Sequence, residues 1–271
     1  NDDSWRVHVG ANVDLSFGNG KAVRVSPDVK AQYVFSDSYV LYAKATGGRQ
    51  LNDFRRLETY NPYLDPGQEV RDTYEQLNAG LGFKASPTPG LWFDIFGGYQ
   101  NLKDDLYQSA DQWIGGSGAN YIALGQTNTD NFYAGIKASY EYKDLFALSA
   151  GGTYYHWDTD NKGTDSGASS YDEALLMKPE FDFGIHAEVH PIPALWLNAG
   201  YQYTRRAERY SVAYGKSIPA VSNLSLGATY KIFKGISAYV KADNLLNKKY
   251  QYYLYYPVEG INFVGGLSFQ F

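Results

Sequence analysis

The stretch that decides the fold is residues 5–17, which read Trp5-Arg6-Val7-His8-Val9-Gly10-Ala11-Asn12-Val13-Asp14-Leu15-Ser16-Phe17. Every second residue is apolar, and the residues between them are polar or glycine. A period of two places successive side chains on opposite faces of an extended chain, so this stretch predicts a β-strand. It is about twice as long as the strands of typical globular proteins and reaches the roughly 9–11 residues that cross a bilayer at a tilt.

The same alternation recurs along the chain and predicts twelve strands. One face of each strand is apolar, and the other carries lysine, acidic residues, glutamine and asparagine. Aromatic residues gather near the strand ends, as they do at a membrane interface. We therefore expect the apolar face to meet lipid and the polar face to line a lumen. The eleven further strands are expected at residues 23–35, 39–46, 77–83, 91–99, 132–142, 146–154, 175–189, 195–203, 224–232, 236–242 and 261–271.

The connections between these strands alternate in length. Tight turns at 36–38, 86–90, 143–144, 190–194 and 234–235 alternate with long connections at about 47–72, 101–130, 158–172, 205–217 and 244–260. The sequence therefore predicts an all-β fold, a transmembrane antiparallel up-and-down β-barrel of about 12 strands with short periplasmic turns and long extracellular loops. Residues 1–271 form one barrel domain in this interpretation, with both termini periplasmic. A barrel must close in lipid, because an open edge leaves backbone groups unpaired.

Composition narrows the function further. The chain has 271 residues, 17% aromatic residues and no cysteine, which excludes disulfides and thiol chemistry. A net charge of -5 argues against a nucleic-acid partner. No apolar run reaches the roughly 18 residues of a membrane helix, and Asn1-Asp2-Asp3 does not begin a signal sequence, so we expect a mature chain or a fragment.

Two motifs carry a resemblance to a known family. Asp243-Asn244-Leu245-Leu246-Asn247-Lys248-Lys249-Tyr250 is followed by a turn containing Gly260 and by a last strand that ends in Phe271. This resembles the end of TonB-dependent outer-membrane receptors. Upstream, Asn61-Pro62-Tyr63-Leu64-Asp65-Pro66 resembles the family's Asn-Pro-x-Leu-x-Pro-Glu loop. The matches run from about residue 26 to the end of the chain.

The resemblance implies the C-terminal barrel portion of such a receptor, acting in uptake of a small ligand across the outer membrane of a Gram-negative bacterium. Gly67 stands where the family usually has Glu, and Ile261 where Arg is common. The family also has a plug domain, a TonB-contacting box and a barrel of about 22 strands, which this chain cannot accommodate. Alternative hypotheses are a structural or assembly subunit of a larger outer-membrane complex and a passive pore. Expected partners are outer-membrane lipid and lipopolysaccharide, with a separate plug, a TonB-type protein or a lipoprotein as further candidates.

An enzyme is the other class of small outer-membrane barrel to consider. A serine nucleophile requires a histidine base within hydrogen-bonding distance, and none of the four histidines has a serine two positions away. His186 and His190 would lie more than about 12 Å apart on a strand, too far to share a metal ion. We therefore expect no catalytic residue, no metal site and no cofactor.

Ligand contacts are expected in the extracellular loops. Guanidinium groups suit phosphates and carboxylates, and tyrosine rings can stack on ring-bearing ligands. Solvated or lipopolysaccharide-bound arginines and tyrosines that pack along a hairpin are the alternatives. The candidates are Arg49, Arg55, Arg56, Tyr60, Arg205, Arg206, Arg209, Tyr252, Tyr253 and Tyr255. The residues expected to line the lumen are Arg24, Lys30, Asp94, Lys137, Glu141, Lys178, Glu180, Asp182, His186 and Lys241, whose mixed signs predict no ion selectivity.

Overall fold

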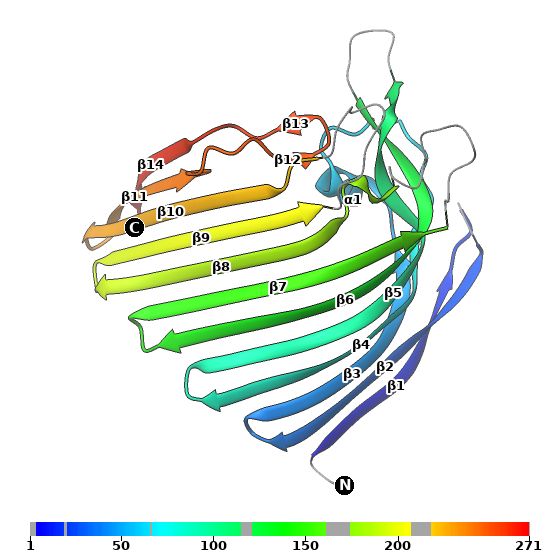
Figure 1. The fold of residues 1–271 in the computed structure, drawn as a ribbon, viewed down its shortest axis with the longest axis horizontal. Helices are drawn as coiled ribbons and strands as arrows, with labels where there is room; N and C mark the ends of the chain where they lie inside the picture. Colours follow the sequence, from blue (N-terminus) through cyan, green and yellow to red (C-terminus); the bar gives the residue numbers. More distant parts are fainter. Residues whose placement is uncertain are drawn as a thin grey trace.

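The main element of the computed structural model is one 12-stranded antiparallel sheet in which successive strands pair side by side (Figure 1). The structure describes residues 4–18, 21–65, 67–114, 121–160, 174–206 and 218–270. The predicted all-β, up-and-down architecture of twelve strands is confirmed. The strands are β1 (Trp5–Leu15), β2 (Val23–Ser36), β3 (Tyr39–Gln50), β4 (Thr73–Thr88), β5 (Leu91–Ile114), β6 (Tyr121–Tyr142), β7 (Phe146–Thr159), β8 (Pro179–Ile192), β9 (Leu195–Arg206), β10 (Val221–Phe233), β11 (Ile236–Asp243) and β14 (Asn262–Phe269).

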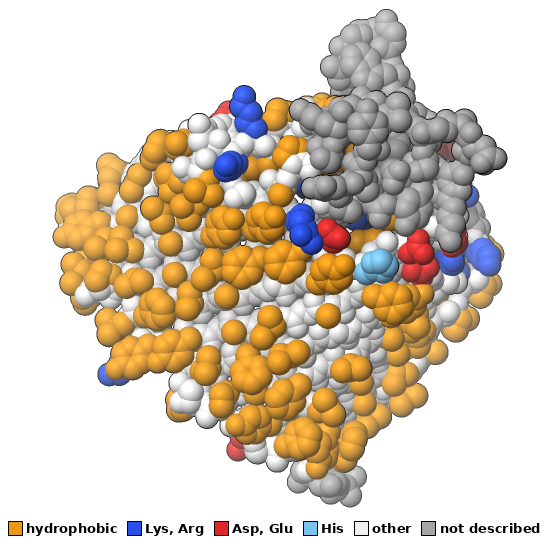
Figure 2. All heavy atoms as spheres, viewed as in Figure 1, with side chains coloured by type: hydrophobic (Ala, Val, Ile, Leu, Met, Phe, Trp, Pro, Cys, Tyr) orange, Lys and Arg blue, Asp and Glu red, His pale blue; other side chains and the backbone are white. Residues whose placement is uncertain are grey.

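The register of the sheet keeps the two kinds of side chain apart. Ile95 pairs with Ile136, and the adjacent Asp94 pairs with Lys137. Because side chains alternate along a strand, these two pairs lie on opposite faces of the sheet. Figure 2 shows the apolar face, where hydrophobic side chains cover the middle of the strands. Val9 on this face is 76% exposed, so the apolar side chains are directed outward and not into a core.

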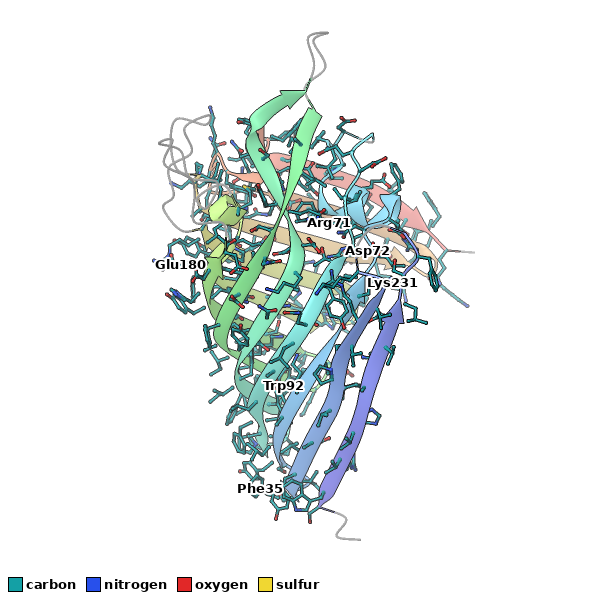
Figure 3. The ribbon with its side chains drawn as sticks, turned by 90° about the vertical axis from the view of Figure 1, so that its right-hand side faces the viewer. Phe35, Arg71, Asp72, Trp92, Glu180 and Lys231 are labelled. Carbon is teal, nitrogen blue, oxygen red and sulfur yellow. The ribbon has the colours of Figure 1, made fainter. Side chains whose placement is uncertain are left out.

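The two ends of the sheet differ as the sequence predicts. Figure 3 shows Phe35 beside the short turn that joins β2 to β3, and Arg71 and Asp72 among the long connections at the other end. We call these the short-turn end and the long-loop end. β5 and β6 continue far into the stretch predicted as a loop at 101–130, and Figure 1 shows them rising as a ribbon above their neighbours. β8 begins at Pro179, so the strand expected from residue 175 starts too early.

The outer edges of the sheet are free. Among the described residues, β1 pairs only with β2, and β14 pairs only with β11. Figure 1 shows β1 and β14 at opposite sides of the curved sheet, so the expected closure is not made by pairing these two strands. The described chain is a curved wall with one polar and one apolar face.

A second, small core lies at the long-loop end. Ile122, Leu176, Ile218 and Leu254 are each at most 6% exposed and pack together, and we call them the loop core. Helix α1 (Phe54–Tyr60) and the hairpin of β12 (Gln251–Tyr253) and β13 (Tyr256–Pro257) lie in the same region (Figure 1). Within the described ranges, no helix has the length and apolar character needed to cross a membrane.

A glycine at the short-turn end offers a first test of the fold. Gly90 joins β4 to β5 with φ of +82°, and a Cβ there would lie 2.1 Å from the carbonyl oxygen of Glu141. We expect Gly90→Ala to lower the free energy of unfolding by about 2 kcal/mol, because both the backbone angle and the contact with β6 resist a side chain. Urea unfolding in lipid vesicles measures this. Gly18→Ala, where nothing lies within 4 Å of the added Cβ, is the control and should change little. Equal effects of the two substitutions would contradict the prediction.

Candidate functional site

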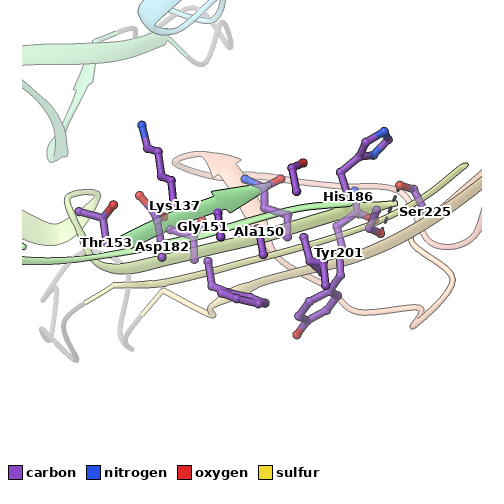
Figure 4. A pocket seen from close by; sticks show the side chains of 18 of the residues that line it. Lys137, Ala150, Gly151, Thr153, Asp182, His186, Tyr201 and Ser225 are labelled. Atoms are coloured by element: carbon purple, nitrogen blue, oxygen red, sulfur yellow. Dashed lines mark hydrogen bonds between the residues drawn. The ribbon is translucent and has the colours of Figure 1, made fainter. Parts of the chain in front are cut away.

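The polar face of the sheet carries a cavity of about 730 Å³ over β6 to β10 (Figure 4). Lys137, Thr153, Asp182 and His186 project to the same side of the sheet in this view, whereas Tyr201 projects to the other. The polar-face residues that line it are Trp92 of β5 and, on β6 to β10, Lys137, Ser149, Gly151, Thr153, Asp182, Gly184, His186, Gly200, Gln202, Thr204, Asn223 and Ser225. The cavity therefore presents hydroxyl, amide, imidazole and mixed charged groups to whatever enters it.

The depth of the cavity comes from residues with little or no side chain. Gly151 pairs with Gly184 across β7 and β8, and Gly200 pairs with His186 on the next strand pair. A polar face built on glycine and serine leaves room above the sheet that larger side chains would fill. Lys137 and Asp182 stand at the border of this floor and supply one charge of each sign.

The polar face over β3 to β6 is filled instead of hollow. The hydroxyl of Tyr42 donates to Asp94 at 2.9 Å, and the ammonium of Lys84 lies 5.2 Å from the Tyr42 ring. Lys137 lies 5.3 Å from the ring of Phe96. Aromatic rings and paired charges thus occupy this half of the polar face, which confines the open space to β6–β10.

The residues predicted to line a lumen do not all lie together. The structure brings Lys137, Asp182 and His186 to the cavity. Glu180 is the extra residue of a β-bulge between Pro179 and Phe181, and its carboxylate pairs with Arg205 at 3.2 Å instead of lining the cavity. The other predicted residues lie outside the cavity. Four lysines and arginines form ion pairs there: Arg24 with Asp104, Lys30 with Asp28, Lys178 with Asp105 and Lys241 with Asp243. Asp94 accepts a hydrogen bond from Tyr42, and Glu141 lies at the short-turn end.

Arg206 differs from the other predicted arginines because it is buried. It is 7% exposed, follows the cavity residue Thr204 by two positions on β9, and therefore projects from the same face. Its guanidinium donates to the carbonyls of Met177 at 3.4 Å and Pro219 at 3.5 Å, both long for hydrogen bonds. Within the described part of the chain it forms no ion pair, since Arg205 takes Glu180. These two carbonyls leave most of its five N–H donors without a hydrogen-bond partner among the described residues.

The remaining predicted arginines serve the loops that carry them. Arg49 donates to the carbonyl of Leu15, and Arg56 to the side chain of Gln50. Arg55 is exposed on α1, and Arg209 lies outside the described residues. Arg206 is thus the predicted arginine that projects from the cavity face of the sheet next to a cavity residue, Thr204.

The predicted tyrosines mostly hold loops to one another. The hydroxyl of Tyr60 donates to the carbonyl of Leu106, and burial raises the pKa of this phenol well above its usual value, so the group remains a donor. Tyr253 meets the ring of Tyr63 edge-on with centroids 5.8 Å apart. Tyr252 donates to Gln202, a residue of the cavity, and Tyr255 forms the turn of the β12–β13 hairpin.

The histidines do not come together. His8 contacts Asp28, and His190 contacts Glu188 at 2.6 Å. No group of three metal-ligating side chains occurs among the residues that the structure describes. His186 lines the cavity alone.

Several residues of this site were not anticipated from the sequence. Gln202 and Asn223 are uncharged members of alternating strands, and only their position on the polar face could have indicated them. Gln108 is 4% exposed and accepts hydrogen bonds from two separate loops, but it lies in a stretch expected to be an extended loop. A buried glutamine that bridges loops leaves no periodic signal.

Comparison with known proteins shows the fold. No protein-family model and no curated protein sequence matches the chain. Among solved structures, FpvA of Pseudomonas aeruginosa, described in complex with a pyoverdine and iron, matches with a TM-score of 0.67 and 15% identity over 99% of this chain. The ferric-catecholate import receptor Fiu of E. coli K12 matches with a TM-score of 0.66 and 12% identity over 99% of this chain. The copper transporter OprC matches with a TM-score of 0.59 and 16% identity over 92% of this chain.

These proteins are TonB-dependent outer-membrane receptors and transporters, so the resemblance expected from the two motifs is confirmed for the fold. The chain spans 36% of the length of FpvA, 43% of Fiu and 40% of OprC. Its twelve strands thus correspond to a part of the barrel wall of such proteins.

Proposed function

We propose that residues 1–271 form one unit of barrel wall in an outer-membrane receptor that takes up a small ligand in a TonB-dependent manner. The observation that carries this proposal is the combination of a lipid-compatible apolar face with a polar cavity on the opposite face of the same sheet. A soluble sandwich would bury its apolar face, whereas here that face is open. The short-turn end is then periplasmic and the long-loop end extracellular, with both termini periplasmic.

The free edges fit such a unit. β1 and β14 run in opposite directions, because eleven antiparallel pairings lead from the first strand of the 12-stranded sheet to the last. In lipid each must meet another strand, since unpaired backbone groups in hydrocarbon are costly. Any even number of further antiparallel strands satisfies both edges. This need for strands also gives the assembly-subunit hypothesis its support, because those strands could come from another chain.

The proposed environment assigns the remaining partners. Lipid would cover the apolar face, and exposed cationic groups at the long-loop end, such as Arg55, would meet lipopolysaccharide phosphates. A plug segment or a separate plug and a TonB-type protein would act from the periplasmic side. The net charge of -5 argues against a nucleic-acid partner.

Arg206 is the residue we propose for contact with the ligand. A buried guanidinium that forms no ion pair with a described carboxylate favours an anion, because burial strengthens charge-assisted hydrogen bonds and penalises an unpaired charge. The adjacent cavity offers the hydroxyl of Thr204 and the amide of Gln202 as further polar contacts. An anionic chelate or a ligand with a carboxylate would match this set.

The test uses two iron complexes of similar size and different charge. The chain, reconstituted in lipid vesicles, is titrated with the trianionic ferric tris-catecholate and with the neutral ferric tris-acetohydroxamate while its tryptophan fluorescence is recorded. We expect saturable quenching by the anionic complex and at least about tenfold weaker binding in Arg206→Met, the loss expected for a hydrogen bond to a charged group. Arg205→Met, which removes the neighbouring outward-paired arginine, should leave binding unchanged. Equal quenching by both complexes, or no effect of Arg206→Met, would refute the assignment.

A stable open conductance in planar bilayers, with no ligand-dependent quenching, would favour a passive pore instead. Co-purification of further barrel chains, with neither conductance nor quenching, would favour the assembly subunit.

A further inference from the structure

The connection between β11 and β14, residues 244–261, begins as a rigid base. Asn244 is 4% exposed, and its side-chain amide donates to the carbonyls of Lys248 and Glu259 at 2.9 and 2.8 Å. Its side-chain oxygen accepts from the backbone N–H of Lys248, and its own backbone N–H donates to Asn223. One asparagine thereby ties the outgoing limb, the returning limb and β10 together. We call residues 244–261 the strap.

The tip of the strap lies far from its base when followed along the sheet. Leu254, at the turn between β12 and β13, donates its backbone N–H to the side chain of Gln108 at 2.9 Å. Gln108 belongs to β5, and five strands, β6 to β10, lie between β5 and β11. At about 4.8 Å per strand, the path along the sheet is about 29 Å. The strap therefore crosses the concave side of the sheet at the long-loop end, where Figure 1 shows β12 and β13 beside α1.

The tip is held at one point by two kinds of contact. Leu254 is fully buried in the loop core with Ile122, Leu176 and Ile218. Gln108 accepts from the Leu254 N–H and also from the side-chain amide of Asn61, which follows α1. Beside it, Tyr256 stacks on Tyr63 with ring centroids 3.4 Å apart. A single buried glutamine thus joins the strap to β5 and to the connection that contains α1.

The strap also touches the cavity. The hydroxyl of Tyr252 donates to Gln202 at 3.1 Å, and Gln202 lines the cavity on the polar face. A ligand that binds Gln202 would compete for this hydrogen bond. The strap therefore lies at the long-loop end of the sheet and at the same time contacts a residue that a bound ligand would contact.

We propose that the strap is a gate across the extracellular mouth of the lumen, latched by Gln108 and free to swing about the base at Asn244. The base keeps its own four hydrogen bonds when the tip leaves Gln108, so opening breaks contacts only along the crossing. A ligand that takes Gln202 from Tyr252 favours the open form. The direction of ligand traffic rests on the proposed receptor function, whereas the latch itself does not.

The absence of cysteine from the chain makes the latch directly testable. Leu254→Cys places one thiol at the buried tip, and its rate of reaction with a membrane-impermeant maleimide reports how often the tip is released. In vesicles we expect slow labelling, and labelling at least about tenfold faster when Gln108→Ala is added. Gln100→Ala is the matched control. This glutamine lies on the same strand, and its amide donates to Glu75 and not to the strap, so its replacement should leave the rate unchanged.

Hydrogen exchange at the Leu254 amide provides a second measurement in a chain with its natural leucine, in case the cysteine variant does not fold. Gln108→Ala should remove protection at this amide while leaving the amides of Asn244 and Lys248 protected. Fast labelling of the tip with Gln108 intact, or slow labelling and full protection in a folded Gln108→Ala chain, would overturn the proposal. Neither measurement requires a ligand, so failure of the latch and failure of the receptor function are distinguished.

Discussion

Ile136→Arg is expected to lower the free energy of unfolding in lipid by about 2–4 kcal/mol, the cost of a basic side chain near the bilayer midplane on the lipid face of a barrel. Ile136 lies on the part of β6 that pairs with both β5 and β7, is 50% exposed on the apolar face, and pairs with Ile95 on one side and Gly152 on the other. No carboxylate stands among these neighbours to compensate a charge. An arginine there must therefore leave hydrocarbon or draw water into it.

Lys137→Ile is the matched substitution one position away. The Lys137 side chain lies on the polar face, where it lines the cavity and approaches the ring of Phe96. Replacing it with isoleucine should cost much less, because water and polar groups already surround the site. Urea unfolding of both variants in vesicles, followed by the gel shift of the heat-modifiable barrel, measures the two values. A larger loss for Lys137→Ile would reverse the two faces of β6, since a shift of one residue exchanges them.

The alternation in the sequence predicts the sheet well wherever one face is apolar and the other polar. The alternation ends above the part of the strands proposed to span the membrane, which explains why the upper halves of β5 and β6 are expected from the sequence to be a loop. There the register shifts between Leu102 and Asp105, and Leu106 is buried among other loops instead of facing lipid. Apolar and polar side chains then occur on both faces of the strands, so the sequence no longer alternates with a period of two.

Just before β8 the sequence predicts a strand where the structure has none. Leu175 and Met177 continue the alternation of the strand that follows, but residues 174–176 form a helical turn and Leu176 packs in the loop core. An apolar residue buried against loops and an apolar residue facing lipid look the same in a sequence. Only the partner differs, and the partners, such as Ile122 and Leu254, come from distant connections.

The sequence predicts which residue types a ligand would meet, but not which of those residues lie together in space. Six loop arginines matched the chemistry of an anionic ligand equally well, and only burial separates Arg206 from them. The role of Gln108 depends on backbone and side-chain groups of the strap and of Asn61, which lie 146 and 47 residues away. Contacts of that range follow from how the loops pack together, and a single sequence carries no periodic trace of them.

The second large effect is expected at the buried ion pair of Lys178 and Asp105. Lys178 lies in the turn before β8, and its ammonium contacts the carboxylate of Asp105 on β5 and the face of Trp157, 4.6 Å from the ring centroid. Asp105 is 7% exposed and also accepts from the hydroxyl of Thr129. Lys178→Met keeps the length of the side chain and removes the charge. We expect a loss of about 3–5 kcal/mol in the free energy of unfolding, because a buried carboxylate then remains without its counter-charge.

Two further variants separate this explanation from a simple packing defect. Lys241→Met removes a lysine whose partner, Asp243, is one-third exposed and should cost at most about 1 kcal/mol, as surface ion pairs do. Adding Asp105→Asn to Lys178→Met removes the orphaned charge while an amide oxygen remains to accept from Thr129, and it should recover much of the lost stability. Urea unfolding of the four chains supplies the comparison. If the double variant is no more stable than Lys178→Met, the loss arises from the packing of the lysine stem against Trp157, and the charge of Asp105 does not govern the stability of this part of the wall.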